Sequence, residues 1–317
     1  MKTNLILAIN PGSTSTKIAV FENDKEVFLK NIKHSTESLQ PFEKITDQYE
    51  FRKKIIFDEL NTAGININNF GAIVGRGGLV KPIKSGVYSV NEKMLEDLKE
   101  GVLGQHASNL GGLIAHNIAN NLPNARAFIA DPVVVDEMDD VARVAGHPNF
   151  ERISIFHALN QKAIARTHCK QQNTEYENVN LIVAHMGGGV SVGAHRRGRV
   201  VDVNNALDGD GPFSPERSGS LPTGQLVKLC FSGKYSQQDV KQMIKGQGGF
   251  TAYLGTNDAY EVEKRTESGE EKAALIQDAL AYQVAKEIGS MSAALEGNVD
   301  AILLTGGIAY GKPIVDA

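Results

Sequence analysis

The same order of strands and turns occurs twice in this chain, at residues 5–32 and again at residues 180–203. Each time an apolar run leads through a glycine-containing turn into a second β-rich run, and a short polar turn then leads into a third. The two copies lie too far apart for a solenoid, whose units of roughly 20–50 residues follow one another directly. We therefore predict a duplicated α/β domain in which each copy begins with an antiparallel meander of three strands.

Strand and helix patterns also alternate outside the two meanders. Buried strands are predicted at residues 72–75, 125–131 and 300–307. Apolar side chains at helical spacing predict helices at residues 35–63, 91–100, 109–121, 222–231, 236–245 and 271–296. A chain of 317 residues is long for one hydrophobic core. We therefore expect two domains, residues 1–150 and residues 151–317, that flank an active-site cleft.

The composition argues against several classes of protein. A formal net charge of -4, with acidic and basic residues interspersed, gives no basic surface for nucleic acid or for an anionic membrane. No apolar run is long enough to span a membrane or to form the core of a signal peptide. Cys169 and Cys230 are far apart and belong to no metal-binding motif. We expect a cytoplasmic protein without disulfides or structural zinc.

Three turns contain the small residues that are typical of phosphate-binding loops. Where a strand stops at such residues, consecutive backbone N–H groups are exposed, and glycine lets the backbone approach a phosphate closely. Any one of them is more often only a turn, but two occupy the same point of the repeated meander. The Walker pattern and GxGxxG are both absent, which argues against P-loop and dinucleotide-binding folds. The turns contain Asn10, Ser13, Ser15 and Lys17 in the first, Gly187, Gly188 and Gly189 beside His185 in the second, and Gly306 and Gly307 in the third.

Seven motifs follow one another along the chain: NPGSTSTK at 10–17, GRGG at 75–78, HASNLGG at 106–112, FHALNQKAIAR at 156–166, HMGGG at 185–189, ERSGSLPTG at 216–224 and TGGIA at 305–309. Through them the whole chain resembles the acetate and butyrate kinase family, and most closely its butyrate kinases. The resemblance implies duplicated actin-like ATPase domains of the ribonuclease H-like type. It also implies reversible transfer of the γ-phosphate of ATP, with Mg²⁺, to butyrate or a branched C4–C5 acid, giving ADP and an acyl phosphate. A homodimer or higher homo-oligomer is implied as well.

The resemblance also assigns roles to individual residues. A carboxylate is already a nucleophile at neutral pH, so the main requirement is to offset the repulsion between two anions. By the resemblance, Arg217 stabilises the transition state and Arg76 holds the substrate carboxylate. Asn10 and Asp131 are implied to position magnesium. The remaining residues are implied to surround the nucleotide: His106, His157 and His185 near the γ-phosphate, the three turns along the phosphates, and Asn257 and Asp258 beside the adenosine.

Other interpretations stay open. An actin-like or chaperone-like module that binds ATP, or hydrolyses it slowly, needs the phosphate turns but not the two arginines. A sugar kinase uses an aspartate base, a part that Asp131 could take, although a turn or cap aspartate is also common at such a position. Asn257 and Asp258 could equally be ordinary turn residues. The choice of acid is open too, because acetate kinases and branched-chain fatty acid kinases share the motifs.

Two further expectations concern the substrate and the end of the chain. Gly75 and Ala206 stand where acetate kinases place larger side chains against the acetyl methyl, which favours a longer acid unless both residues meet backbone requirements instead. Family members continue beyond the TGGIA motif through another strand and a helix that carries an acidic magnesium-positioning residue. We therefore expect that a chain ending at Ala317 is C-terminally incomplete.

Overall fold

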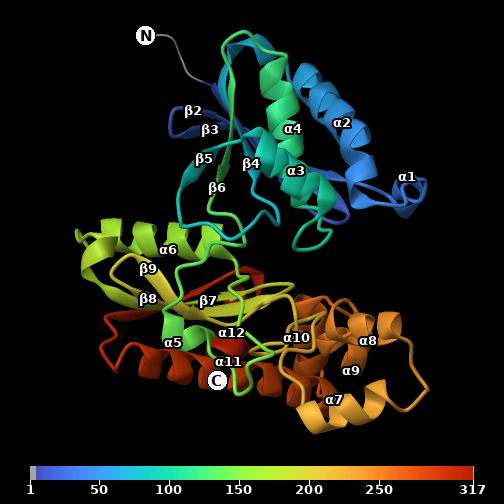
Figure 1. Ribbon diagram of the computed structural model, residues 1–317, viewed down its shortest axis with the longest axis vertical. Coiled ribbons are helices and arrows are strands. Elements are labelled where there is room, and N and C mark those ends of the chain that lie inside the picture. The colour runs from blue at the N-terminus through green and yellow to red at the C-terminus, as the bar shows by residue number, and fades with distance from the viewer. Residues whose placement is uncertain (1–4, 317) are drawn as a thin grey trace. The chain divides into compact units, whose positions relative to one another are not determined.

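The computed structural model describes residues 5–316 and divides the chain into two compact units, Met1–Val135 and Asp136–Ala317. Each unit contains one β-sheet (Figure 1). The division lies about 15 residues before the boundary expected near residue 150. Hydrogen bonds tie the intervening segment to the second unit: the Asp139 N–H donates to the Val201 carbonyl at 2.9 Å, and Lys162 Nζ lies 2.7 Å from Glu137 Oε2.

The sheet of the first unit has the strand order β3-β2-β1-β4-β6-β5. The first three strands form the predicted antiparallel meander, and β4 and β6 run parallel to β1, while β5 pairs antiparallel with β6 at the edge. The strands are β1 (Leu5–Pro11), β2 (Ser15–Glu22), β3 (Lys25–Lys33), β4 (Phe70–Arg76), β5 (Val87–Ser89) and β6 (Arg126–Ala130).

Helices α2 and α4 pack against this sheet through a shared hydrophobic core (Figure 1). Ile56 and Leu60 of α2 and Ile114 of α4 are fully buried there, as the helical spacing of apolar residues predicts. Helix α3 begins after Asn91, whose side chain accepts from the Met94 N–H. The helices of this unit are α1 (Thr36–Leu39), α2 (Tyr49–Thr62), α3 (Glu92–Glu100) and α4 (Asn109–Asn120), with short 3₁₀ helices at Ile45–Gln48 and Ile67–Asn69.

The sheet of the second unit repeats the arrangement of the first. Its order is β10-β7-β8-β9, with β7, β8 and β9 as an antiparallel meander and β10 parallel to β7. Read from β9, the order matches β3-β2-β1-β4, so the predicted duplication is confirmed. The strands are β7 (Asn180–Met186), β8 (Val190–Arg196), β9 (Arg199–Val203) and β10 (Ala301–Thr305).

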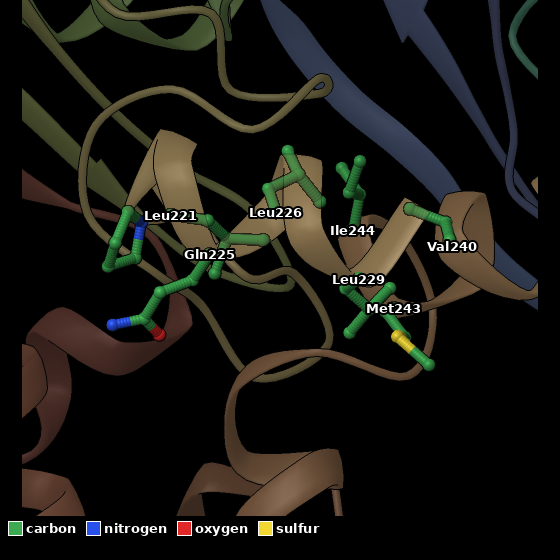
Figure 2. Close-up of a pocket in the computed structure, with 8 residues that line it drawn as sticks. Leu221, Gln225, Leu226, Leu229, Val240, Met243 and Ile244 are labelled. Atoms are coloured by element: carbon green, nitrogen blue, oxygen red, sulfur yellow. The ribbon is translucent and has the colours of Figure 1, made fainter. Parts of the chain in front are cut away.

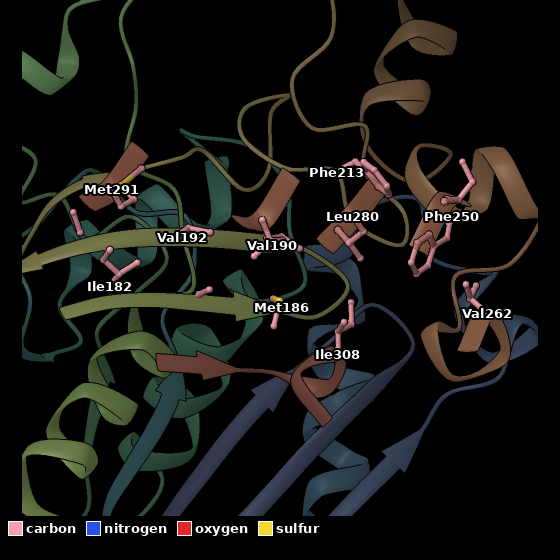
Figure 3. Close-up of a cluster of buried hydrophobic side chains, with 14 of the residues drawn as sticks. Ile182, Met186, Val190, Val192, Phe213, Phe250, Val262, Leu280, Met291 and Ile308 are labelled. Carbon is pink, nitrogen blue, oxygen red and sulfur yellow. The ribbon is translucent and has the colours of Figure 1, made fainter. Parts of the chain in front are cut away.

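Alternate residues of β7 face two different helices. Ile182 and Ala184 belong to the core between the sheet and the long helix α11 (Figure 3), whereas Leu181 and Val183 pack against α6. The predicted helices at 222–231, 236–245 and 271–296 are confirmed, while α6, α9 and α10 were not predicted. No helix within residues 5–316 combines the length and the apolar character needed to cross a membrane. The helices are α5 (Asp140–Arg143), α6 (Ala158–Gln171), α7 (Thr223–Cys230), α8 (Gln237–Ile244), α9 (Gly249–Leu254), α10 (Ala259–Glu267), α11 (Glu271–Ala294) and α12 (Lys312–Val315), with 3₁₀ helices at Tyr176–Asn178 and Gly307–Tyr310.

Candidate functional site

Three neighbouring parallel strands of the first sheet bring predicted site residues to one edge. Because β1, β4 and β6 are paired in parallel, their carboxyl ends carry Asn10, Arg76 and Asp131 along the same edge. Arg76 Nη1 donates to Asn10 Oδ1 at 3.2 Å. Burial lowers the pKa of Arg76, but a guanidinium stays charged at neutral pH. Lys17 lies directly opposite Asn10 on β2 and adds a second cation.

Asp131 is held rigidly just after β6. The residue is 6% exposed, and its Oδ1 accepts hydrogen bonds from Ser85 Oγ at 2.6 Å and from the Gly86 N–H at 2.8 Å. Its φ of 35° is unusual for a residue with a side chain. Strain of this kind is concentrated at functional sites. The same contacts also give Asp131 a structural part in this turn.

A buried arginine that belongs to none of the seven motifs binds the carbonyls of the first phosphate turn. Arg52 of α2 is 1% exposed and donates to the carbonyls of Gly12, Ser13 and Ser15 at 2.7, 3.0 and 2.9 Å. In a planar trans peptide the N–H points opposite to the preceding carbonyl. The N–H groups of Ser13 and Thr14 therefore point away from Arg52, in the orientation that a bound phosphate requires.

The charge of Arg52 is compensated by dipoles. Gln48 Oε1 accepts from its Nε and Nη2 at 3.0 and 2.7 Å, and Thr16 Oγ1 accepts from Nη1 at 3.0 Å. Burial lowers the pKa of Arg52 to about 10. Burial and then the Arg52 charge lower the pKa of His34, which contacts Thr16, to about 4, so this histidine is neutral. The signal in the sequence is a charged residue within the apolar stripe of a helix, between Tyr49 and Ile56.

His106 makes local contacts at the start of α4. Its Nδ1 accepts from the Ser108 N–H at 3.2 Å and lies 2.8 Å from Ser108 Oγ. A backbone N–H can only donate, so Nδ1 is the unprotonated nitrogen and the neutral ring carries its proton on Nε2. Its place near the γ-phosphate stays a prediction.

In the second unit, Arg217 lies directly over the glycine turn between β7 and β8. A Cβ at Gly189 would lie 2.8 Å from Arg217 Cζ, still closer to Nη1, and 3.3 Å from His157 Cε1. Only a residue without a side chain leaves room for these two groups. Arg217 Nη1 also donates to the Ala206 carbonyl at 2.6 Å, which fixes the position of the guanidinium.

The glycine turn itself is held by its carbonyls. The Gly187 N–H donates to the Gly189 carbonyl at 3.0 Å, and Ser214 Oγ donates to the Gly188 carbonyl at 2.7 Å. The Gly189 N–H therefore points away from Ser214. A Cβ at Gly188 would meet only Glu216 Oε1, at 4.0 Å, so the middle of the turn is open. These are the properties of a backbone that can approach a phosphate.

Two predicted histidines stack on each other beside this turn. The ring centroids of His157 and His185 are 3.8 Å apart, with an angle of 14° between the ring planes. His157 precedes the first residue of α6, and its Nδ1 lies 2.8 Å from Ser191 Oγ. His185 Nδ1 lies 2.7 Å from Asn160 Oδ1. The structure thus brings together Arg217, the stacked histidines and the glycine turn.

The third turn follows β10. Gly306 has a φ of 93°, and a Cβ there would collide with the backbone of Met186. At Gly307, by contrast, a Cβ would meet nothing within 4 Å. A cavity of about 270 Å³ adjoins it, with Tyr260 and Tyr310 among its walls. A cavity with aromatic walls beside an exposed glycine backbone suits the nucleoside part of a nucleotide.

Asn257 and Asp258 precede α10. Asp258 Oδ1 accepts from the N–H groups of Tyr260 at 2.9 Å and Glu261 at 3.4 Å, so this carboxylate is the N-cap of the helix. Asn257 Nδ2 donates to Glu216 Oε2 at 3.4 Å. These contacts give both residues a local structural part, and contact with adenosine stays a prediction.

The acyl-pocket interpretation of Gly75 is wrong. A Cβ at Gly75 would collide with the backbone of Gly111, because α4 lies against β4 at this point. Gly75 is therefore required by packing and not by the size of a substrate. The Ala206 N–H donates to the Ile155 carbonyl at 2.9 Å, and the Ala206 carbonyl accepts from Arg217. A proline at position 206 would break the first of these bonds.

A further cavity, of about 150 Å³, lies between α7 and α8 (Figure 2). Its walls are mainly apolar, with Leu226, Leu229 and Ile244 among them, and none of its lining side chains is charged. It therefore lacks the cation that would bind a carboxylate or a phosphate.

Known proteins resemble this chain in sequence and in fold. The acetokinase family profile matches residues 150–312. Acetate kinase from Porphyromonas gingivalis is 19% identical with a TM-score of 0.78, covering 98% of this chain and 86% of that one. A propionate kinase from Francisella tularensis subsp. tularensis is 21% identical with a TM-score of 0.77, covering 99% and 87%. Acetate kinase from Entamoeba histolytica is 18% identical with a TM-score of 0.75, covering 99% and 86%. These similarities confirm the predicted actin-like fold.

Proposed function

The chain belongs to the acetokinase family, and from this membership we propose that it transfers the γ-phosphate of ATP to the carboxylate of a short-chain fatty acid, with butyrate as the preferred acid. The motifs typical of butyrate kinases support the choice of acid. The similarity to acetate and propionate kinases supports the wider class, a phosphotransferase with a carboxyl group as acceptor.

One observation carries the proposal: Arg217 lies over Gly189 beside the stacked His157 and His185. Phosphoryl transfer requires fixed donors that face the charge developing on the transferring group. The Ala206 carbonyl holds the guanidinium in place before any substrate arrives, so little reorganisation is needed during the reaction. A module that only binds ATP has no need of a fixed arginine at this turn.

We assign the binding of the substrate carboxylate and of magnesium to the first unit. Arg76 binds the carboxylate of the substrate, and Asn10 and Asp131 bind Mg²⁺ through hard oxygen ligands. Mg²⁺ in a kinase site needs only one or two protein oxygens besides those of the nucleotide phosphates. Bound there, magnesium would neutralise charge on the phosphates. Lys17 and the N–H groups of the first turn add further positive potential.

The experiment is an acyl-hydroxamate assay. The full chain is incubated with ATP, magnesium and hydroxylamine, together with acetate, propionate, butyrate, isobutyrate or isovalerate, and with no acid as the control. Hydroxylamine traps acyl phosphate as the hydroxamate. We expect product with several acids and the highest kcat/KM with butyrate. Hydrolysis of ATP without hydroxamate from any acid would reject the kinase, and a maximum with another acid would reject only butyrate.

A further inference from the structure

A row of buried hydrogen bonds connects His157 to the interior of the second unit. Ser191 Oγ lies 2.8 Å from His157 Nδ1, and Gln161 Nε2 donates to Ser191 Oγ at 2.9 Å and to the Ser191 carbonyl at 3.0 Å. Beyond them, His195 Nε2 lies 2.9 Å from Gln161 Oε1, and the Tyr176 hydroxyl lies 2.6 Å from His195 Nδ1. All except His157 are at most 3% exposed, so bulk water does not compete for these bonds.

The chemistry of the groups determines which atoms in this row donate and which accept. The Ser191 carbonyl can only accept, so the Gln161 amide turns its nitrogen towards Ser191 and its oxygen towards His195. His195 must therefore donate from Nε2. Burial and the charges of Lys162 and Arg166 lower the pKa of His195 to about 3, so the ring is neutral. Its Nδ1 then accepts from the Tyr176 hydroxyl.

The same reasoning assigns the donor between Ser191 and His157. A hydroxyl has one hydrogen and two acceptor positions. Ser191 Oγ already accepts from Gln161 Nε2, and it accepts weakly from the His157 N–H at 3.4 Å. Its own hydrogen is then directed at His157 Nδ1. A neutral imidazole whose Nδ1 accepts a hydrogen bond carries its proton on Nε2.

We propose that Tyr176, His195, Gln161 and Ser191 are positioning residues that hold His157 as the neutral tautomer protonated on Nε2. The inference rests on the proposed function and specifies what His157 does there: it donates an N–H to a phosphoryl oxygen without adding a full charge. Arg217 then provides the charge and His157 the oriented dipole. A donor fixed in this way stabilises the transferring group without turning its ring during the reaction.

One substitution reverses the two hydrogen bonds of this row that lie nearest His157 and keeps the shape of the side chain. Gln161→Glu replaces the amide nitrogen that donates to the Ser191 hydroxyl and carbonyl with a carboxylate oxygen, which accepts, so the bond to the carbonyl is lost. The Ser191 hydroxyl then donates to the new carboxylate, and His157 must donate from Nδ1 to Ser191 Oγ. The matched control is Gln277→Glu, which places the same change at another buried glutamine of this unit. Gln277 is 2% exposed, and its Oε1 accepts from Thr266, outside the row. Because Gln277 also lines the cavity beside Gly307, this variant is the control for the spectrum and not for the kinetics.

The experiment is ¹H–¹⁵N NMR of the full chain labelled with ¹⁵N-histidine, at about pH 8, above the ordinary pKa of an imidazole. The His157 signals are identified by their loss in His157→Gln. We expect an unprotonated Nδ1 and a protonated Nε2 in the parent and in Gln277→Glu, and the reverse in Gln161→Glu. We expect kcat of Gln161→Glu to fall about 100-fold with the KM for ATP nearly unchanged.

A parent His157 that is protonated on Nδ1, or on both nitrogens, would overturn the proposal. So would an unchanged tautomer in a folded Gln161→Glu variant. If that variant does not fold, the parent spectrum still decides, and Ser191→Ala is expected to give a mixture of the two tautomers. The spectrum does not depend on turnover, so a chain with the expected tautomer and no hydroxamate product would reject the kinase and keep the assignment of the proton.

Discussion

Adding one methyl group at Gly189 should displace Arg217. In Gly189→Ala the new Cβ would lie 2.8 Å from Arg217 Cζ, whereas ordinary van der Waals contact begins at 3.4 Å. The overlap with Nη1 is greater, so the guanidinium has to move by about 1 Å and stretch or break its bond to the Ala206 carbonyl. A displacement of about 1 Å at a reacting centre can lower the rate about 100-fold. We expect kcat to fall by about that factor.

The assay is steady-state hydroxamate formation with butyrate, together with the Kd for ATP from calorimetry. The displaced group acts on charge that develops in the transition state, so we expect the Kd to change less than threefold or so. The matched control is Gly188→Ala in the same turn, where the nearest atom to the new Cβ is Glu216 Oε1 at 4.0 Å. It should lower kcat much less. Equal losses in both variants would refute the part assigned to the Gly189 contact.

Three other substitutions test separate parts of the account. Arg52→Met leaves the carbonyls of the first phosphate turn without their donor, so we expect the Kd for ATP to rise about tenfold by calorimetry, and an unchanged Kd would contradict the support role. Gly75→Ala should lower the free energy of unfolding in urea by about 3 kcal/mol or more, whereas Gly146→Ala, which meets no atom within 4 Å, should change it little. Burial and the charges of Asp210 and Asp202 raise the pKa of Glu287 to about 7, partly offset by Arg152. The protonated Glu287 carboxyl therefore stabilises the fold at low pH, and this contribution is lost as pH rises through 7. Glu287→Gln should therefore be more stable than the parent by about 1 kcal/mol at pH 8 and equal to it below about pH 4.5, and a constant difference across this range would contradict the shift.

The parts of the fold that depend on local pattern could be predicted from the sequence. The repeat of strand, glycine turn and strand gave both meanders, because alternation and turn residues act over a few neighbouring positions. The helix at 271–296 could be predicted for the same reason. The apolar pattern does not predict helix α6, because its buried face includes Gln161 and Lys162, polar residues whose partners lie far along the chain.

In the candidate site too, the parts that lie within one motif could be predicted, and the contacts between distant residues could not. The glycine turns and Arg217 follow from motifs that are contiguous in the sequence. The support of the first turn depends on Arg52, about 40 residues away from the carbonyls it binds, and the Ser191–His157 contact spans 34 residues. Gly75 shows the opposite error. The small residue predicts a deep pocket, whereas the space beside it is filled by the backbone of α4 at Gly111.

The most direct test of the account is Arg217→Ala. With [γ-³²P]ATP, magnesium and butyrate in a single turnover, we expect the rate of labelled acyl phosphate formation to fall about 1,000-fold or more, because the guanidinium acts on transition-state charge. The Kd for ATP should stay close to that of the parent. A folded variant that forms acyl phosphate at the parent rate would contradict the central claim that Arg217, fixed over the glycine turn, stabilises the transferring phosphoryl group.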